Sequence, residues 1–168
     1  MLQILSRNKK GFIFLEVLIA SALIGIVFIT LLGMGFLALN ISTSIKQTTR
    51  ANFLMQEALE AMRSFRDGSD WAANGLGVVN TGSANPYYAT LDTTVNPPAW
   101  KLLAGTETVG GFTRSLVFDK VSRNPSNQDI EAVYNSANND PDSRKITVTV
   151  ASGSTTYQVV EYLTNWNP

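Results

Sequence analysis

Residues 9–16 of the chain are Lys-Lys-Gly-Phe-Ile-Phe-Leu-Glu, and they open a long apolar run. Residues 12–39 carry one charge, Glu16, and contain no Pro, Asn or Gln. An α-helix rises about 1.5 Å per residue, so a helix of this length reaches roughly 42 Å. The hydrocarbon core of a bilayer is about 30 Å thick. The run therefore predicts a helix that spans a membrane.

The apolar content of this run outweighs the cost of its carboxylate. The run holds 18 Leu, Ile, Val and Phe residues, and together they favour insertion by about 5 to 11 kcal/mol. A central acidic residue opposes insertion by roughly 2.5 to 3.5 kcal/mol, and Glu16 lies near one end. An ionisable residue inside a membrane segment is a functional-site candidate whose counter-charge has to be identified.

Two ordinary interpretations of the run compete. In the first, it is a secretory signal peptide cut after Ala20-Ser21-Ala22, but that cut leaves the apolar residues 23–39 on the mature protein. In the second, it is a plain single-pass anchor with an incidental Glu16. Neither interpretation explains why two lysines and Gly11 directly precede the run, or why Glu16 is the fifth residue after Gly11.

Residues 11–20 resemble the N-terminal signature of type IV pilins and pseudopilins. This signature is a short basic leader, a Gly, an aromatic or apolar residue, three mostly apolar residues, a Glu and a long apolar helix. The resemblance implies that residues 1–11 are a leader and that a prepilin peptidase cuts between Gly11 and Phe12 and methylates Phe12. Glu16 then pairs with a new amine and sets the register of the subunit in a filament.

The resemblance also implies the partners of the chain. They are the prepilin peptidase, other pilin or pseudopilin subunits, an inner-membrane assembly platform and membrane lipid. Residues 13–15, Ile-Phe-Leu, replace the more usual Thr-Leu-Ile, and the following Glu-Val-Leu-Ile-Ala is similar to minor PilV-like and GspI-like subunits. Type IV pilus, type II secretion and DNA uptake all remain open as the machine that the subunit serves.

Composition excludes several other classes of protein. The chain has 13 basic and 13 acidic residues, and loss of Arg7, Lys9 and Lys10 with the leader leaves 10 basic against 13 acidic, a net −3. This balance does not favour nucleic-acid binding. The sequence has no Cys and no His, which removes the usual nucleophiles, bases and zinc ligands. We expect no enzymatic activity and no cofactor. The basic leader favours a cytoplasmic N-terminus, with the C-terminal domain outside the cytoplasm.

Residues 40–67 predict an amphipathic continuation of the same helix, which we expect to end at Gly68 as a C-terminal cap. The chain offers no break between residues 39 and 65, so the prediction is one helix of about 55 residues. Its apolar stripe is expected to pack on the chain's own sheet, with a partner-binding face as the alternative. The stripe consists of Ile41, Ile45, Met55, Ala58, Leu59 and Met62.

Residues 68–168 predict a loop followed by a small antiparallel sheet. Residues 69–98 form a long polar connection with one short strand at 87–91, in which Trp71, Tyr87 and Tyr88 either cover the loop or form a ligand patch. Further strands are expected at 100–103, 112–121, 145–151 and 155–163, the last two joined by a short turn that contains Gly153. The fold class is α+β, with the long N-terminal helix packed on the sheet.

The polar loop at 124–144 contains Asp140-Pro141-Asp142, whose oxygens suit calcium. The spacing is not that of an EF-hand, and Asp-Pro-Asp is also an ordinary turn. The main functional alternative to a filament subunit is a single-pass anchored adhesin or binding module that recognises a ligand through residues 69–98 and forms no filament.

Overall fold

The computed structural model describes residues 9–166, so residues 1–8 of the predicted leader lie outside the described residues. The chain divides into two compact units, Met1–Gln47 and Thr48–Pro168. This boundary falls within the predicted amphipathic half, residues 40–67. The elements are, in order, α1 (Lys9–Gly68), β1 (Tyr87–Asp92), β2 (Ala99–Ala104), β3 (Glu107–Val109), β4 (Phe112–Ser122), the 3₁₀ helix η1 (Ser136–Asn138), β5 (Asn139–Ser152) and β6 (Thr155–Thr164).

The first unit consists of the N-terminal part of α1. Within the described residues, α1 is the one helix long and apolar enough to cross a membrane. The large apolar side chains from Phe12 to Ile45 are exposed along it. The hydroxyl groups of Ser21 and Thr30 donate to the carbonyl oxygens of Leu18 and Val27, at 2.9 and 2.8 Å. These hydroxyls are therefore satisfied within the helix, as an apolar surrounding requires.

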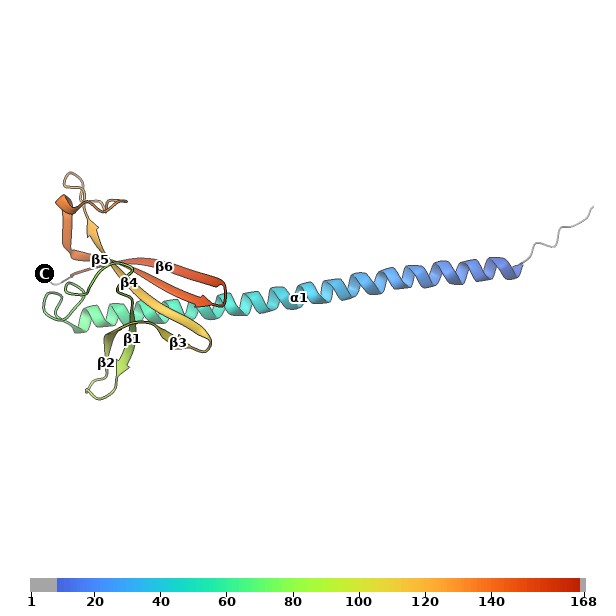
Figure 1. Cartoon of the computed structure of the whole chain (residues 1–168), viewed down its shortest axis with the longest axis horizontal. Helices are drawn as coiled ribbons and strands as arrows, with labels where there is room; N and C mark the ends of the chain where they lie inside the picture. The colour runs from blue at the N-terminus through green and yellow to red at the C-terminus, as the bar shows by residue number, and fades with distance from the viewer. Residues whose placement is uncertain (1–8, 167–168) are drawn as a thin grey trace, which may run out of the picture. The chain divides into compact units, whose positions relative to one another are not determined.

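The second unit is built on one antiparallel sheet of order β2-β1-β4-β5-β6, with β3 paired to the end of β4 (Figure 1). The ladders β4–β5 and β5–β6 are long, whereas β1 meets β4 only at Tyr87 and Leu116. β5 and β6 form the predicted hairpin, with Gly153 at a φ of 58° in its turn. The predicted α+β class, a long N-terminal helix packed on an antiparallel sheet, is confirmed.

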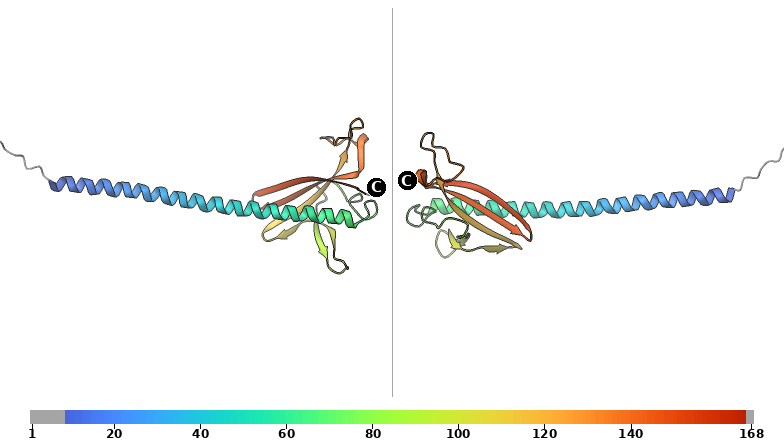
Figure 2. Two further views of the ribbon diagram at one scale, coloured as in Figure 1. Left: turned by 180° about the vertical axis from the view of Figure 1, so that it is seen from behind. Right: turned by 45° about the horizontal axis from the view of Figure 1, so that its top comes forward.

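The core lies between the C-terminal part of α1 and one face of the sheet (Figure 2). Alternate residues of β4 and β5 point toward the helix, as the period of two in their sequences predicts. The helix contributes small side chains together with Met55 and Met62, which lets it lie close to the sheet. The buried residues are Ala51, Leu54, Met55, Ala58, Ala61 and Met62 from α1, Phe112, Leu116 and Phe118 from β4, and Ile146, Val148 and Val150 from β5.

Two expectations about α1 are wrong in detail. Gly68 is the last residue of the helix and is not among the glycines with a positive φ, so it does not form a left-handed cap. Instead the hydroxyl of Ser69 donates to the carbonyl oxygen of Phe65 at 2.6 Å and satisfies one of the last carbonyl groups. Ile41 and Ile45, the first members of the predicted stripe, are exposed, whereas Met55, Ala58 and Met62 pack on the sheet.

The strands also differ from the prediction in two places. β3 was not expected, because three residues are too short to show an alternating pattern. β5 begins at Asn139, so part of the predicted loop 124–144 is strand. Pairing continues past a register shift between Lys120 and Val121, which leaves residues 141–143 as the extra residues of β5. Pro141 is tolerated there because a bulge needs no ladder hydrogen bond from it.

Candidate functional site

The predicted processing and assembly residues lie together near the start of α1. Gly11, Phe12 and Glu16 are all helical and exposed, with Phe12 at 66%. Positions 12 and 16 are four residues apart, so they share one face of the helix and lie one turn from each other. With Leu15, Ile19, Ala20 and Leu23, they line a shallow groove along that face.

The structure gives Gly11 no role in packing. A Cβ added at Gly11 would meet no atom within 4 Å, and the same holds for Gly25, Gly33 and Gly35. Helix propensity disfavours Gly by up to about 1 kcal/mol relative to Ala. Within the described residues, packing therefore gives no reason for glycine at these four positions.

Glu16 has no countercharge within the described side chains. Residues 11–166 contain several ion pairs, and none of them includes Glu16. In an apolar surrounding an isolated carboxylate is costly. A free amine at the nitrogen of Phe12 would lie about one helical turn from Glu16 within the same chain. The geometry thus allows amine–carboxylate pairing but needs a cut before Phe12 to create the amine.

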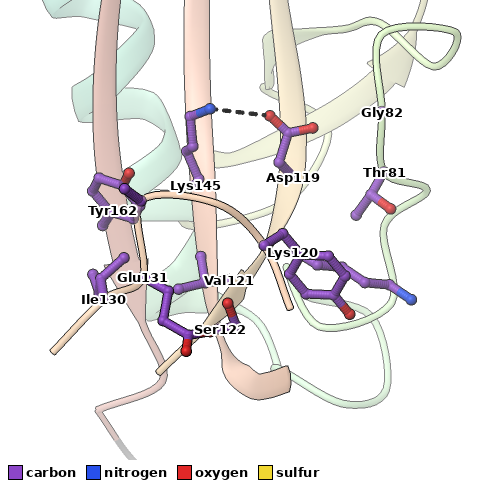
Figure 3. Close-up of a pocket in the computed structure, with 12 residues that line it drawn as sticks. Thr81, Gly82, Asp119, Lys120, Val121, Ser122, Ile130, Glu131, Lys145 and Tyr162 are labelled. Atoms are coloured by element: carbon purple, nitrogen blue, oxygen red, sulfur yellow. Dashed lines mark ion pairs between the residues drawn. The ribbon is translucent and has the colours of Figure 1, made fainter. Parts of the chain in front are cut away.

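The second unit contains a cavity of about 390 Å³ beside the C-terminal end of β4, next to Lys145 of β5 and Tyr162 of β6 (Figure 3). Asp119 and Lys145 face each other across neighbouring strands at 3.5 Å, and Tyr162 flanks Lys145. Glu131 enters from the loop and accepts a hydrogen bond from Asn138 at 2.9 Å. Its other carboxylate oxygen is buried without a partner in the described residues, so solvent cannot reach it from the cavity.

The two candidate calcium ligands are occupied by the protein itself. One oxygen of Asp140 accepts from Arg123 at 2.6 Å and the other from the amide of Asp142 at 2.9 Å. Asp142 accepts from the side-chain amide of Asn165 at 3.1 Å. The described residues contain no cluster of three or more His, Cys, Asp or Glu side chains that could hold a metal. The pattern Asp-Pro-Asp lies within β5, at the irregularity in its pairing with β4.

The aromatic residues of the 69–98 connection cover the core. Trp71 is buried and donates to the carbonyl oxygen of Pro141 at 3.0 Å. Tyr87 packs edge-to-face on Phe118, with ring centroids 5.6 Å apart. The same connection places Leu76 in the core. For Trp71 and Tyr87 the covering interpretation is therefore confirmed.

Two buried arginines were not singled out from the sequence. Arg114 is 3% exposed, donates to Glu107 at 2.7 Å and to the carbonyl oxygen of Leu54 at 2.9 Å. In the alternating pattern of β4, Arg114 occupies the same face as Phe112 and Leu116, and this position could have indicated that it is buried. Arg144 stacks on Trp71 and donates to the carbonyl oxygen of Gly77 at 2.6 Å. Burial lowers the pKa of Arg144, although it stays a cation.

Neither the family models, nor the curated proteins, nor the solved structures contain a match to this chain.

Proposed function

We propose that the chain is a structural subunit of a type IV pilus or of a type II secretion-like pseudopilus. A prepilin peptidase cuts between Gly11 and Phe12 and methylates Phe12. Before assembly, the mature subunit is held in the cytoplasmic membrane by α1, with its C-terminal domain outside the cytoplasm. It then joins a filament through α1, whose apolar surface exchanges lipid for neighbouring helices.

One observation carries the proposal. Glu16 lies one helical turn from Phe12 on an apolar surface that no other part of the described chain covers. A carboxylate in this position favours a nearby amine, and a cut after Gly11 supplies one at the required spacing. The anchored adhesin receives no such support, because its recognition loop contributes Trp71 and Leu76 to the core.

Intact mass and N-terminal sequencing of the protein from its native membrane test the proposal. We expect a chain that begins at methylated Phe12. A chain that begins at Met1 would favour the anchored adhesin. A chain that begins at Leu23 would identify an ordinary signal peptide and a released protein.

The same measurement on two glycine variants tests the position of the cut. Gly11→Val is expected to leave the leader attached, because the peptidase needs a small residue where it approaches the backbone. Gly25→Val is the matched control, since a Cβ meets no atom within 4 Å at either glycine. Normal processing of Gly11→Val would contradict a cut after Gly11.

A further inference from the structure

We infer that the cavity beside the C-terminal end of β4 binds a neutral saccharide of one or two rings. The inference goes beyond the proposed function and does not depend on it, because every residue that lines the cavity belongs to the second unit. The cavity holds about 390 Å³. Sites for small ligands range over roughly 300 to 1,000 Å³, so this volume limits the ligand to a small molecule.

One wall of the cavity is a row of side chains across three neighbouring strands. Asp119 of β4 pairs with Lys145 of β5, which pairs with Tyr162 of β6. These side chains stand on the face of the sheet away from α1, since their neighbours Phe118 and Ile146 are buried in the core. Figure 3 shows Asp119 and Lys145 pointing toward each other, with Tyr162 beyond Lys145. The row thus presents an acceptor, a donor and an aromatic ring, in that order.

Two loops complete the lining of the cavity, and hydrogen bonds fasten both of them to β4. In the loop after β4, the amide of Glu131 donates to the carbonyl oxygen of Ser122, and the amide of Asn135 donates to the Ser122 hydroxyl, both at 2.9 Å. In the connection before β1, the amide of Gly82 donates to the carbonyl oxygen of Phe118 at 2.8 Å. The cavity is therefore formed without a ligand, which lowers the ordering cost of binding.

Asp119 and Lys145 keep hydrogen-bonding capacity that a ligand can use. Their charged atoms are 3.5 Å apart, and their side chains are 39% and 37% exposed. A charge-assisted hydrogen bond is usually about 2.7 to 2.9 Å long, so this contact is loose. A carboxylate accepts several hydrogen bonds and an ammonium group donates several. Most of the capacity of both groups therefore remains available to a ligand.

The charges around the cavity favour a ligand that is neutral. Asp119 and Glu131 are acidic, whereas Lys120 and Lys145 are basic. A ligand with a net charge of either sign would meet charges of its own sign there, and this repulsion opposes binding. A hydroxyl group both donates and accepts. Adjacent hydroxyls of a sugar can therefore donate to Asp119 and accept from Lys145 at the same time.

Two tyrosine rings supply the apolar surface against which a sugar ring can pack. Tyr162 and Tyr134 both line the cavity and are 44% and 43% exposed. The hydroxyl of Tyr134 donates to the side chain of Asn139 at 3.0 Å, which restrains the ring. The C–H groups of a sugar ring form an apolar face, and tyrosine covers such a face at a low cost in conformational entropy. Paired charges beside exposed aromatic rings thus fit a saccharide.

Binding of free sugars to the full-length chain tests the inference. The chain is solubilised in a detergent that has no sugar headgroup, and binding is measured by ligand-observed NMR. The probes are glucose, galactose, mannose, N-acetylglucosamine, lactose and cellobiose. We expect at least one of them to bind, and we expect Tyr162→Ala and Asp119→Asn each to weaken that binding at least tenfold. Both side chains are more than one third exposed, so neither change should unfold the domain.

Gln158→Ala is the matched control, because Gln158 is exposed on the same face of β6 as Tyr162 but does not line the cavity. It should bind the sugar as the unaltered chain does. The inference is overturned if none of the six sugars binds, or if all three variants bind equally. Tighter binding of the anionic sugar N-acetylneuraminic acid, or of the zwitterion glycine, than of every neutral sugar would also overturn it. None of these outcomes depends on where the chain is cut, so the proposed function is tested separately.

Discussion

Asp140 is a carboxylate whose ionised form the fold stabilises. Partial burial acts to raise its pKa, but hydrogen bonds from Ser143 and Arg123 outweigh burial and hold the pKa below its ordinary value. A group with a lowered pKa in the folded state contributes stability above its unfolded pKa, about 3.9. This contribution is lost as the pH falls through the lower, folded value.

We therefore expect Asp140→Asn to destabilise the protein at neutral pH and to lose this effect in acid. Asn can still accept from the amide of Asp142 but cannot form the ion pair with Arg123. The difference in unfolding free energy between the two proteins should be constant above about pH 5 and should shrink below about pH 4. Denaturant unfolding at a series of pH values measures it. A gap that grows in acid would contradict the assignment.

Glu16 should matter for assembly rather than for folding. Glu16→Ala removes the carboxylate without touching the core, so we expect normal cleavage and at least a tenfold loss of incorporation into filaments. A loss of about 1.4 kcal/mol in pairing is enough for a factor of ten. Ser21→Ala is the control on the same apolar segment, because the Ser21 hydroxyl bonds only its own helix. Quantitative blotting of sheared filaments against whole cells measures incorporation, and wild-type levels of Glu16→Ala would refute the pairing.

Within α1, the two sides of one short segment should respond differently to truncation. Met62 is fully buried against the sheet, whereas Phe53 is 66% exposed. Met62→Ala should lower the unfolding free energy by about 2 to 5 kcal/mol, because it leaves a cavity. Phe53→Ala should change it by less than about 0.5 kcal/mol. Near-ultraviolet circular dichroism of the detergent-solubilised chain during unfolding compares them; equal losses would mean that Phe53 is also covered.

The period of the sequence was enough to predict the helix, four of its buried or half-buried positions and five of the strands. The periodicity could not show where the apolar stripe of the helix ceases to be buried, because Ile41 and Ile45 continue the same helical pattern as Met55 and Met62. The stripe is buried only where the sheet covers it. Likewise, Pro141 suggested a loop. The strand continues through Pro141 because of a bulge, and the bulge arises from the pairing of β4 with β5, which the local sequence does not show. Local pattern determines the elements, and tertiary pairing determines their ends.

At the scale of the molecule, we expect residues 48–168 to fold without the rest of the chain. All the buried apolar residues of the described chain lie between Ala51 and Leu163. The fragment should be monomeric and should unfold cooperatively, as single domains of this size generally do. A fragment of residues 69–168 is the control, and it should fail to fold because it lacks the helix side of the core. Calorimetry and circular dichroism distinguish the two outcomes.

The candidate site was easier to predict than the core contacts because its residues are neighbours in the sequence. Phe12 and Glu16 need only a helix to fall on one face, and the apolar run already implied that helix; Gly11 directly precedes Phe12 in the sequence. By contrast, the bond from Arg114 to Leu54 joins residues 60 positions apart. An arginine in an alternating strand gives no sign of which distant carbonyl it will meet.

Polar contacts between α1 and the sheet are spread along the helix. Thr48 meets Tyr157, Arg114 meets Glu57 and the carbonyl of Leu54, and Arg63 meets Glu161. The first and last are 15 residues apart on α1, or about 22 Å. Tension applied at Thr48 along this part of α1 would therefore load these contacts together in shear, rather than peel them apart one after another. We expect these contacts to add to the core in resisting extraction of the helix from the sheet.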